Sequence, residues 1–121
     1  MNFLCVALGG ALGAVLRYTL GAIPLKMTFP LHTLIINIAG AILIGFIVGA
    51  INERGEISHN IELFWKTGVC GGFTTFSTFS LESVELFEKD MHILAGVYII
   101  LSITLCLFGI FFGKRIAMGI A

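Results

Sequence analysis

Charged side chains are scarce in this sequence, with only seven Lys or Arg and seven Asp or Glu among 121 residues. Proline occurs only twice, whereas hydrophobic residues make up 58% of the chain. A soluble domain of this length could not hide that much apolar surface from water. The composition therefore excludes an ordinary soluble domain and predicts an all-α membrane protein in a lipid bilayer, with no nucleic-acid partner.

Cysteine is also rare, and the three that occur are Cys5, Cys70 and Cys106. All three lie in stretches that we expect to cross the bilayer, where a thiol behaves as a small apolar group. Their spacing matches no metal-binding or redox motif. We expect neither a disulfide nor a zinc site.

Four apolar stretches are long enough to cross a bilayer, for which about 20 residues are needed. They are residues 2–22, 31–51, 63–81 and 91–113. The short connections hold most of the ionisable groups, so we predict a single domain, residues 1–121, with four transmembrane helices. A cleaved signal peptide is the alternative for the first stretch. Its usual basic leader is missing, because no Lys or Arg occurs among the first sixteen residues.

Basic residues are almost evenly divided between the two sides of the predicted bundle. The side with the N-terminus holds four and the other holds three; these are Arg54, Lys66, Lys114 and Arg115, and Arg17, Lys26 and Lys89. Under the positive-inside rule this difference selects no orientation. Either other features fix one orientation, or the chain inserts both ways and an up subunit pairs with a down subunit in an antiparallel dimer.

Small residues recur every four positions within the predicted spans. The rows are Gly9 with Gly13, Gly10 with Ala14, Ala41 with Gly45 and Gly49, and Gly109 with Gly113. Membrane helices approach closely along such rows, so the pattern predicts a compact bundle.

The stretch from Gly71 to Ser80 combines five hydroxyl groups and three phenyl rings within a predicted span. Hydrocarbon offers a hydroxyl no hydrogen-bond partner, so these groups are expected to face protein, water or an ion. Hydroxyls also compete with helical hydrogen bonding, and a Gly-Gly pair precedes them. We therefore predict that the third helix is broken in mid-membrane, near Gly71–Gly72 and the hydroxyls that follow. The half-helix ends would expose N–H and C=O groups to ions.

Hydroxyls and rings form two parallel tracks beyond the predicted break. They are Thr74, Ser77 and Thr78 on one helical face, and Phe73, Phe76 and Phe79 in steps of three beside it. Further intramembrane hydrogen-bonding side chains are Asn37, Tyr98, Ser102 and Thr104. A phenyl edge is weakly positive and attracts an anion without a fixed charge, whereas plain core packing is the alternative for such rings.

Three motifs stand out along the chain. They are GGALGAVLRY at residues 9–18, TLIINIAG at residues 33–40 and GGFTTFSTFS at residues 71–80. They resemble signatures of the fluoride ion channel family Fluc, also called CrcB. The third motif is highly specific, and the resemblance spans essentially the whole chain.

This resemblance implies an antiparallel, dual-topology homodimer with two pores, each lined by both subunits. Through them fluoride would leave the cell passively, down its electrochemical gradient, which reduces fluoride toxicity. The resemblance also implies a location in the bacterial inner membrane and a structural sodium ion (Na+) at the dimer centre. The backbone carbonyls of Gly71 and Thr74, with their symmetry mates, would bind that ion and so hold the dimer together.

The resemblance also assigns residues to the fluoride pore. They are Asn37, Phe76, Ser77, Thr78, Phe79, Glu82, Tyr98 and Ser102. Asn37 would donate its amide to the ion, Phe76 and Phe79 would contact it edge-on, and the hydroxyls would continue a polar track. Glu82 would lie near a pore end, or be an ordinary solvated carboxylate. Arg17 would belong to an anion-concentrating vestibule, or extend to the membrane interface as a structural residue.

Three other classes fit the sequence less well. A small proton-coupled multidrug transporter would need a carboxylate in mid-membrane, and the first predicted span has no acidic residue. An intramembrane enzyme would need a nucleophile with a base or a metal set, and no His-carboxylate pair lies within the spans. A purely structural membrane peptide would not need the polar track. We expect a channel and no enzyme.

Overall fold

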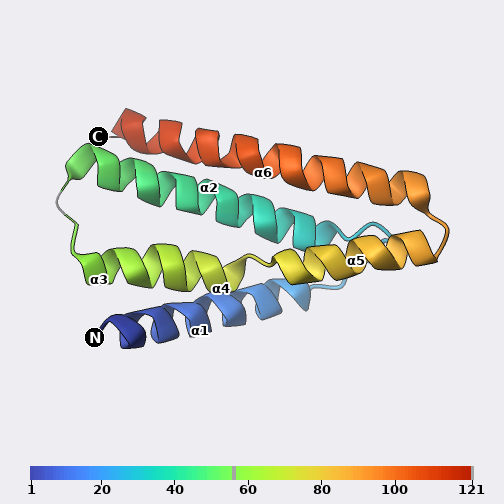
Figure 1. The fold of residues 1–121 in the computed structure, drawn as a ribbon, viewed down its shortest axis with the longest axis horizontal. Helices are drawn as coiled ribbons and strands as arrows, with labels where there is room; N and C mark the ends of the chain where they lie inside the picture. The colour runs from blue at the N-terminus through green and yellow to red at the C-terminus, as the bar shows by residue number, and fades with distance from the viewer. Residues whose placement is uncertain (56, 121) are drawn as a thin grey trace.

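The computed structural model describes residues 1–55 and 57–120, and every regular element in these ranges is a helix. Helices α1 (Asn2–Gly21), α2 (Leu31–Arg54) and α6 (His92–Ile120) are long and continuous. Shorter elements lie between α2 and α6 (Figure 1); they are α3 (His59–Glu62), the π-helix η1 (Leu63–Cys70), α4 (Gly71–Phe73) and α5 (Phe76–Glu88).

An all-α fold is thus confirmed for the part of the chain that the structure describes. Helices α1, α2 and residues 92–119 of α6 are each long and apolar enough to cross a membrane. The remaining predicted span, residues 63–81, is divided among η1, α4 and α5, so no single helix there has that length. Three such helices indicate a protein that passes through the membrane several times.

The helices form two pairs. Helix α2 packs along α6, and α1 packs along η1 and α4 (Figure 1). The two helices of each pair run in the same direction, and the two pairs run in opposite directions. Both termini lie at one end of the bundle, and α5 contacts α6 toward the other end.

Glycines join each pair by bringing two backbones into contact. A Cβ atom added at Gly13 of α1 would lie 2.8 Å from the backbone nitrogen of Phe73. One added at Gly113 of α6 would lie 2.8 Å from the backbone nitrogen of Phe46 in α2. Because these neighbours are backbone atoms, a larger residue at either position would push the helices apart.

The predicted rows of small residues are confirmed in part. A Cβ at Gly9 would lie 2.9 Å from the Cα of Gly68, and one at Gly45 would lie 2.9 Å from the Cα of Ile110. A Cβ at Gly10 would meet nothing closer than 4.0 Å. The row that starts at Gly9 therefore faces its partner helix, whereas a Cβ at Gly10 would make only an ordinary van der Waals contact there.

The helical backbone is interrupted shortly after the Gly71–Gly72 pair, not at the glycines themselves. Both glycines are helical in α4, and the extended residues are Thr74 (φ −83°, ψ 156°) and Thr75 (φ −148°, ψ 119°). Gly72 serves packing instead, since a Cβ there would lie 3.0 Å from the Cα of Gly10. The helical backbone resumes at Phe76, the first residue of α5.

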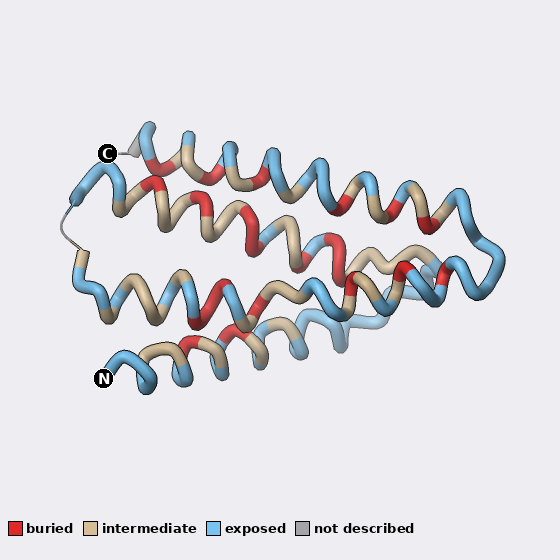
Figure 2. The backbone as a smooth tube through the Cα atoms, viewed as in Figure 1, coloured by how far each residue is buried: buried red, intermediate tan, exposed pale blue. Residues whose placement is uncertain are grey.

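Buried residues lie on the faces that the helices turn toward one another, and the outer faces are exposed (Figure 2). A cluster of buried side chains joins α2, α5 and α6; it consists of Leu34, Phe79, Leu86, Ala95 and Tyr98. Many exposed side chains are large and apolar, such as Phe3, Phe108 and Phe111. This surface suits contact with lipid, which is as apolar as these side chains.

Candidate functional site

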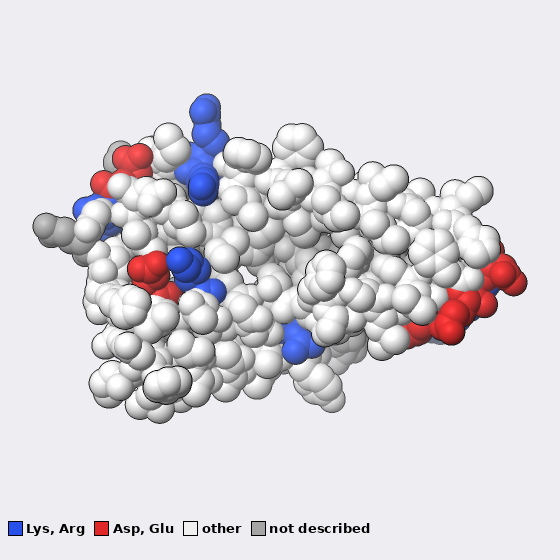
Figure 3. All heavy atoms as spheres, in the orientation of Figure 1, with Lys and Arg blue, Asp and Glu red and all other residues white. Residues whose placement is uncertain are grey.

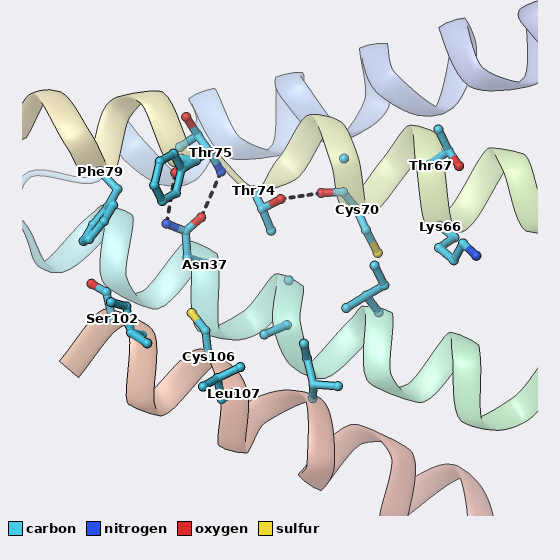
Figure 4. A pocket seen from close by; sticks show the side chains of 17 residues that line it. Asn37, Lys66, Thr67, Cys70, Thr74, Thr75, Phe79, Ser102, Cys106 and Leu107 are labelled. Carbon is cyan, nitrogen blue, oxygen red and sulfur yellow. Dashed lines mark hydrogen bonds between the residues drawn. The ribbon is translucent and has the colours of Figure 1, made fainter. Parts of the chain in front are cut away.

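A cavity of about 460 Å³ lies between the two helix pairs. Its wall is mostly apolar and comes from α2, η1, α4, α5 and α6 (Figure 4). Its polar side chains are Asn37, Lys66, Thr67, Thr74, Thr75 and Ser102. Figure 3 shows a hollow near the middle of one face, whereas most charged side chains on that face lie toward the ends of the bundle.

Lys66 is the one charged residue in the wall of this cavity, as far as the described residues show. Its Nζ donates to Oε1 of Glu62, one helical turn earlier, at 3.0 Å, and both side chains are partly exposed. The carboxylate offsets the lysine charge, so an anion in the cavity faces a neutral pair rather than an isolated cation.

The amide of Asn37 holds the extended residue Thr75 by both of its backbone groups. Nδ2 of Asn37 donates to the carbonyl of Thr75 at 3.1 Å, and the N–H of Thr75 donates to Oδ1 of Asn37 at 2.9 Å (Figure 4). Both groups leave the helical pattern where the backbone is extended, and the side chain replaces the lost partners. Asn37 therefore fixes the interruption from a different helix, α2.

Thr75 also caps the helix that follows. The N–H of Thr78 donates to Oγ1 of Thr75 at 3.2 Å, and Oγ1 of Thr75 donates to Oγ1 of Thr78 at 3.1 Å. On the other side of the interruption, Oγ1 of Thr74 donates to the carbonyl of Cys70 at 2.9 Å. A threonine at this position satisfies a backbone donor of the first turn, as expected for an N-cap residue.

These hydrogen bonds change the partners of two backbone carbonyls. In a continuous helix, the carbonyls of Gly71 and Thr74 would accept from the N–H groups of Thr75 and Thr78. In this structure those N–H groups donate to Asn37 and to Thr75 Oγ1 instead. Gly71 and Thr74 both line the cavity. The interruption thus removes the helical donors of two carbonyls beside one space.

The two rings assigned to the pore differ in their surroundings. Phe79 is buried and packs on Tyr98, with ring centroids 5.2 Å apart, whereas Phe76 is 77% exposed. The rings of Phe76 and Phe79 lie 5.6 Å apart, and both residues line the cavity. The hydroxyl of the fully buried Tyr98 donates to Oε1 of Glu82 at 3.0 Å, which joins α6 to α5.

Ser102 is the cavity residue with the clearest unmet hydrogen-bonding need. It is only 6% exposed, and its Oγ has no hydrogen-bond partner within the described residues. Tyr98, Ser102 and Cys106 are spaced four residues apart and so lie on one face of α6. Thr104, by contrast, is exposed and does not line the cavity.

The other residues assigned from the sequence lie outside the cavity. Ser77 is exposed, and Thr78 is engaged with Thr75. Glu82 borders a smaller pocket of about 210 Å³ beside the loop between α1 and α2. Nε of Arg17 donates to the carbonyl of Gly72 at 3.3 Å and so links α1 to α4.

Several residues of the cavity wall do not stand out in the sequence. The polar ones are Lys66, Thr67 and Thr75. Threonine is a common N-cap residue, so its type alone is a weak signal that a helix starts at Thr75. Cys106 resembles an ordinary apolar residue, and only its distance of four positions from Ser102 indicates that the two share a helix face.

Comparisons with known proteins agree with the resemblance seen in the motifs. A family model described as CrcB-like protein, Camphor Resistance (CrcB), matches residues 4–114. A protein of Ruminiclostridium cellulolyticum named fluoride-specific ion channel FluC is 43% identical over 124 residues, which cover 100% of this chain and 95% of the relative. Proteins of the same name from Roseobacter denitrificans and Methanococcus vannielii are 44% and 40% identical. The alignments cover 98% and 96% of this chain and 97% and 95% of those relatives.

The family match covers all of the helices that line the cavity except the C-terminal end of α6. Apolar helices of membrane-spanning length and the matched relatives together make the chain a multi-pass membrane protein. The chain belongs to the CrcB-like protein family.

Proposed function

We propose that this chain is the subunit of a fluoride-selective channel through which fluoride leaves the cell passively, down its electrochemical gradient. The names of the matched relatives support this function, since proteins 40–44% identical over nearly their full length are called fluoride-specific ion channels. The largely uncharged cavity also supports it. The family is one of channels, so we propose no enzymatic activity.

The main structural support for this function is the hydroxyl of Ser102, which has no hydrogen-bond partner in the described part of the chain. A buried hydroxyl without a partner costs about 1–3 kcal/mol, so such a group in a cavity wall is expected to bond to something that enters the cavity. A small anion accepts the O–H directly, and a water accepts or donates. The hydroxyl lies on the same wall as Cys106 and near Phe79 and Asn37 (Figure 4).

The chemistry of fluoride fits donors of this kind. Fluoride is small and strongly hydrated, so a pore must replace its water by short hydrogen bonds, whereas chloride is too large for the same geometry. One N–H of the Asn37 amide is donated to Thr75, which leaves the second for an ion. The edges of Phe76 and Phe79 add weakly positive surface without a fixed charge. Neutral donors let the ion enter without trapping it.

The remaining assigned residues extend this path. We place the interruption at Thr74–Thr75 in mid-membrane, with Ser77 and Thr78 continuing the polar track beyond it. Tyr98 and Glu82, which are hydrogen bonded to each other, would lie toward one pore end. Arg17 would contribute to the vestibule while its guanidinium holds the carbonyl of Gly72.

An antiparallel, dual-topology homodimer with two pores completes the proposal. Phe76 is 77% exposed and Gly71 is exposed, although both line the cavity, so a second copy would cover them. The carbonyls of Gly71 and Thr74, deprived of their helical donors, fit a structural sodium ion between the copies, because a hard cation prefers oxygen ligands.

Sodium is therefore expected to strengthen the dimer. Replacing sodium by N-methylglucamine in detergent solution should lower the fraction of dimer, and native mass spectrometry of the purified chain measures that fraction. Lithium and potassium at the same ionic strength separate a specific ion from general screening. An unchanged dimer fraction in the absence of sodium would remove the ion from the assembly.

Reconstituted protein tests the transport function. Liposomes loaded with potassium fluoride and containing the purified chain are expected to release fluoride without a proton or sodium gradient once a potassium ionophore lets potassium leave with it, as measured with a fluoride electrode. Chloride-loaded liposomes should release little.

Ser102→Ala is expected to lower the fluoride rate roughly 10-fold or more, since a hydrogen bond to a charged group contributes about 1.5–3 kcal/mol. Thr104→Ala is the matched control, because this hydroxyl is exposed on another face of α6. Equal release of chloride, or equal rates for the two variants, would contradict the proposal.

A further inference from the structure

The cavity wall contains a thiol, Cys106, about one helical turn from the orphan hydroxyl of Ser102. Cys106 lines the cavity four residues after Ser102, and it is neither fully buried nor bonded in a disulfide. Figure 4 shows it on the side of α6 that faces α2. A small molecule or ion bound at Ser102 would therefore lie about one helical turn from this sulfur.

The buried oxygen of Ser102 marks this part of the cavity as a space that takes a ligand. Only 6% of the residue is exposed, its oxygen is buried, and no group in the described part of the chain bonds to that oxygen. The lining around it is mostly apolar. A neutral, small and thiophilic compound enters such a space at little desolvation cost, because it gives up few hydrogen bonds with water.

The other two thiols differ from Cys106 in ways that can be tested. Cys70 also belongs to the cavity wall, but it is only 2% exposed. Cys5 lies on α1 and does not line the cavity. A thiol reacts only if the reagent can reach it. We therefore expect Cys106 to react more readily than the buried Cys70.

We propose that Cys106 is a modification site in the ion path, where a small organomercury compound binds the sulfur and blocks fluoride movement. This inference rests on the proposed function, because the cavity is taken as part of the route for fluoride. The site would make the channel sensitive to soft, thiophilic metals through a single residue of its wall.

The reaction is a ligand exchange without oxidation or reduction. With methylmercury chloride, the mercury–chlorine bond breaks and one sulfur–mercury bond forms. Chloride leaves with the electron pair of the broken bond, and the thiol proton goes to water. Soft thiolate ligands favour soft metals, and an excess of a free thiol such as dithiothreitol takes the methylmercury back and restores Cys106.

The experiment compares fluoride efflux before and after methylmercury chloride in the same liposomes. The wild-type chain is expected to lose at least about 90% of its efflux and to regain it with dithiothreitol. Cys106→Ser should keep its own rate after the reagent, whatever that rate is. Cys70→Ser and Cys5→Ser should remain as sensitive as the wild type. Because each variant is its own reference, a variant with slower efflux still gives a clear ratio.

Mass spectrometry of the treated protein provides a readout that does not depend on transport. Mercury adducts on proteolytic peptides are expected at Cys106 before Cys70. Inhibition that persists in Cys106→Ser, or full modification of Cys106 with unchanged efflux, would overturn the proposal. An unmodified Cys106 in folded wild-type protein would overturn it as well. If the wild type moved no fluoride at all, the proposed function would fail, while the adduct pattern would still show whether the cavity admits a ligand to this thiol.

Discussion

Replacing Asn37 by alanine is expected to abolish measurable fluoride efflux and to lower the stability of the folded chain. The Asn37 amide pairs with both backbone groups of Thr75, at 3.1 and 2.9 Å. Alanine would leave the N–H and C=O of Thr75 without these partners, at about 1–3 kcal/mol for each group. Lipid supplies no replacement donor or acceptor. If the conformation with Thr75 extended loses about 3 kcal/mol of stability, its population falls roughly 100-fold, and fluoride efflux falls with it.

Two measurements separate a structural role of Asn37 from a role as an ion ligand. Fluoride efflux from liposomes reports on both roles, whereas the temperature at which the protein leaves its monodisperse peak in detergent reports on the structural one. Ser80→Ala is the control, because Oγ of Ser80 bonds only to the carbonyl of Phe76 in its own helix, at 2.9 Å. Loss of efflux at unchanged thermal stability would mean that Asn37 only contacts the ion and that the hold on Thr75 matters little.

The same pair of residues explains why local sequence signals give only the approximate position of the interruption. Local signals pointed to Gly71–Gly72, because glycine and clustered hydroxyls both weaken a helix. The residue that fixes Thr75 lies 38 positions earlier, on α2. No window of sequence around the motif contains it. The glycines were informative about a different feature, the close approach of α1 to η1 and α4.

Long apolar stretches were predictable, and their ends were less so. The last apolar stretch, residues 91–113, stops just before Lys114 and Arg115. In the structure α6 continues to Ile120. Basic side chains are long enough to extend toward polar surroundings while their backbone stays helical. Two adjacent basic residues therefore mark the edge of the apolar region rather than the end of the helix.

The candidate site was predictable to the extent that it depends on residue type. Asn37, Phe76, Phe79 and Ser102 come from three separate predicted spans, and the structure brings all four to one cavity. Tyr98 was assigned to the same path, but it packs behind Phe79 and bonds to Glu82. Which hydrogen-bonding side chains of a helix point toward the cavity depends on how the helix is rotated about its axis. Spans that are apolar on nearly all sides do not reveal that rotation from a single sequence.

Gly13→Ala is the second change for which we expect a large effect, although it adds only one methyl group and touches no residue assigned to the ion path. The added Cβ would lie 2.8 Å from the nitrogen of Phe73 and 3.1 Å from the carbonyl carbon of Gly72. Both neighbours are backbone, so no side chain can rotate away. Overpacking of this kind costs about 1–3 kcal/mol, and α1 has to move away from α4 to relieve it. That movement would also break the contact between Arg17 and the carbonyl of Gly72.

Gly10→Ala is the matched control, because it lies on the same helix, adds the same methyl group and would meet no atom closer than 4.0 Å. The thermal transition of Gly13→Ala in detergent is expected to fall by roughly 10 °C, as a loss of about 2–3 kcal/mol implies for a chain of this size, while Gly10→Ala stays near the wild type. Efflux should fall with the fraction of folded protein. Equal stability of the two variants would show that α1 is held to η1 and α4 by its apolar side chains, and that backbone contact through Gly13 is not what sets their spacing.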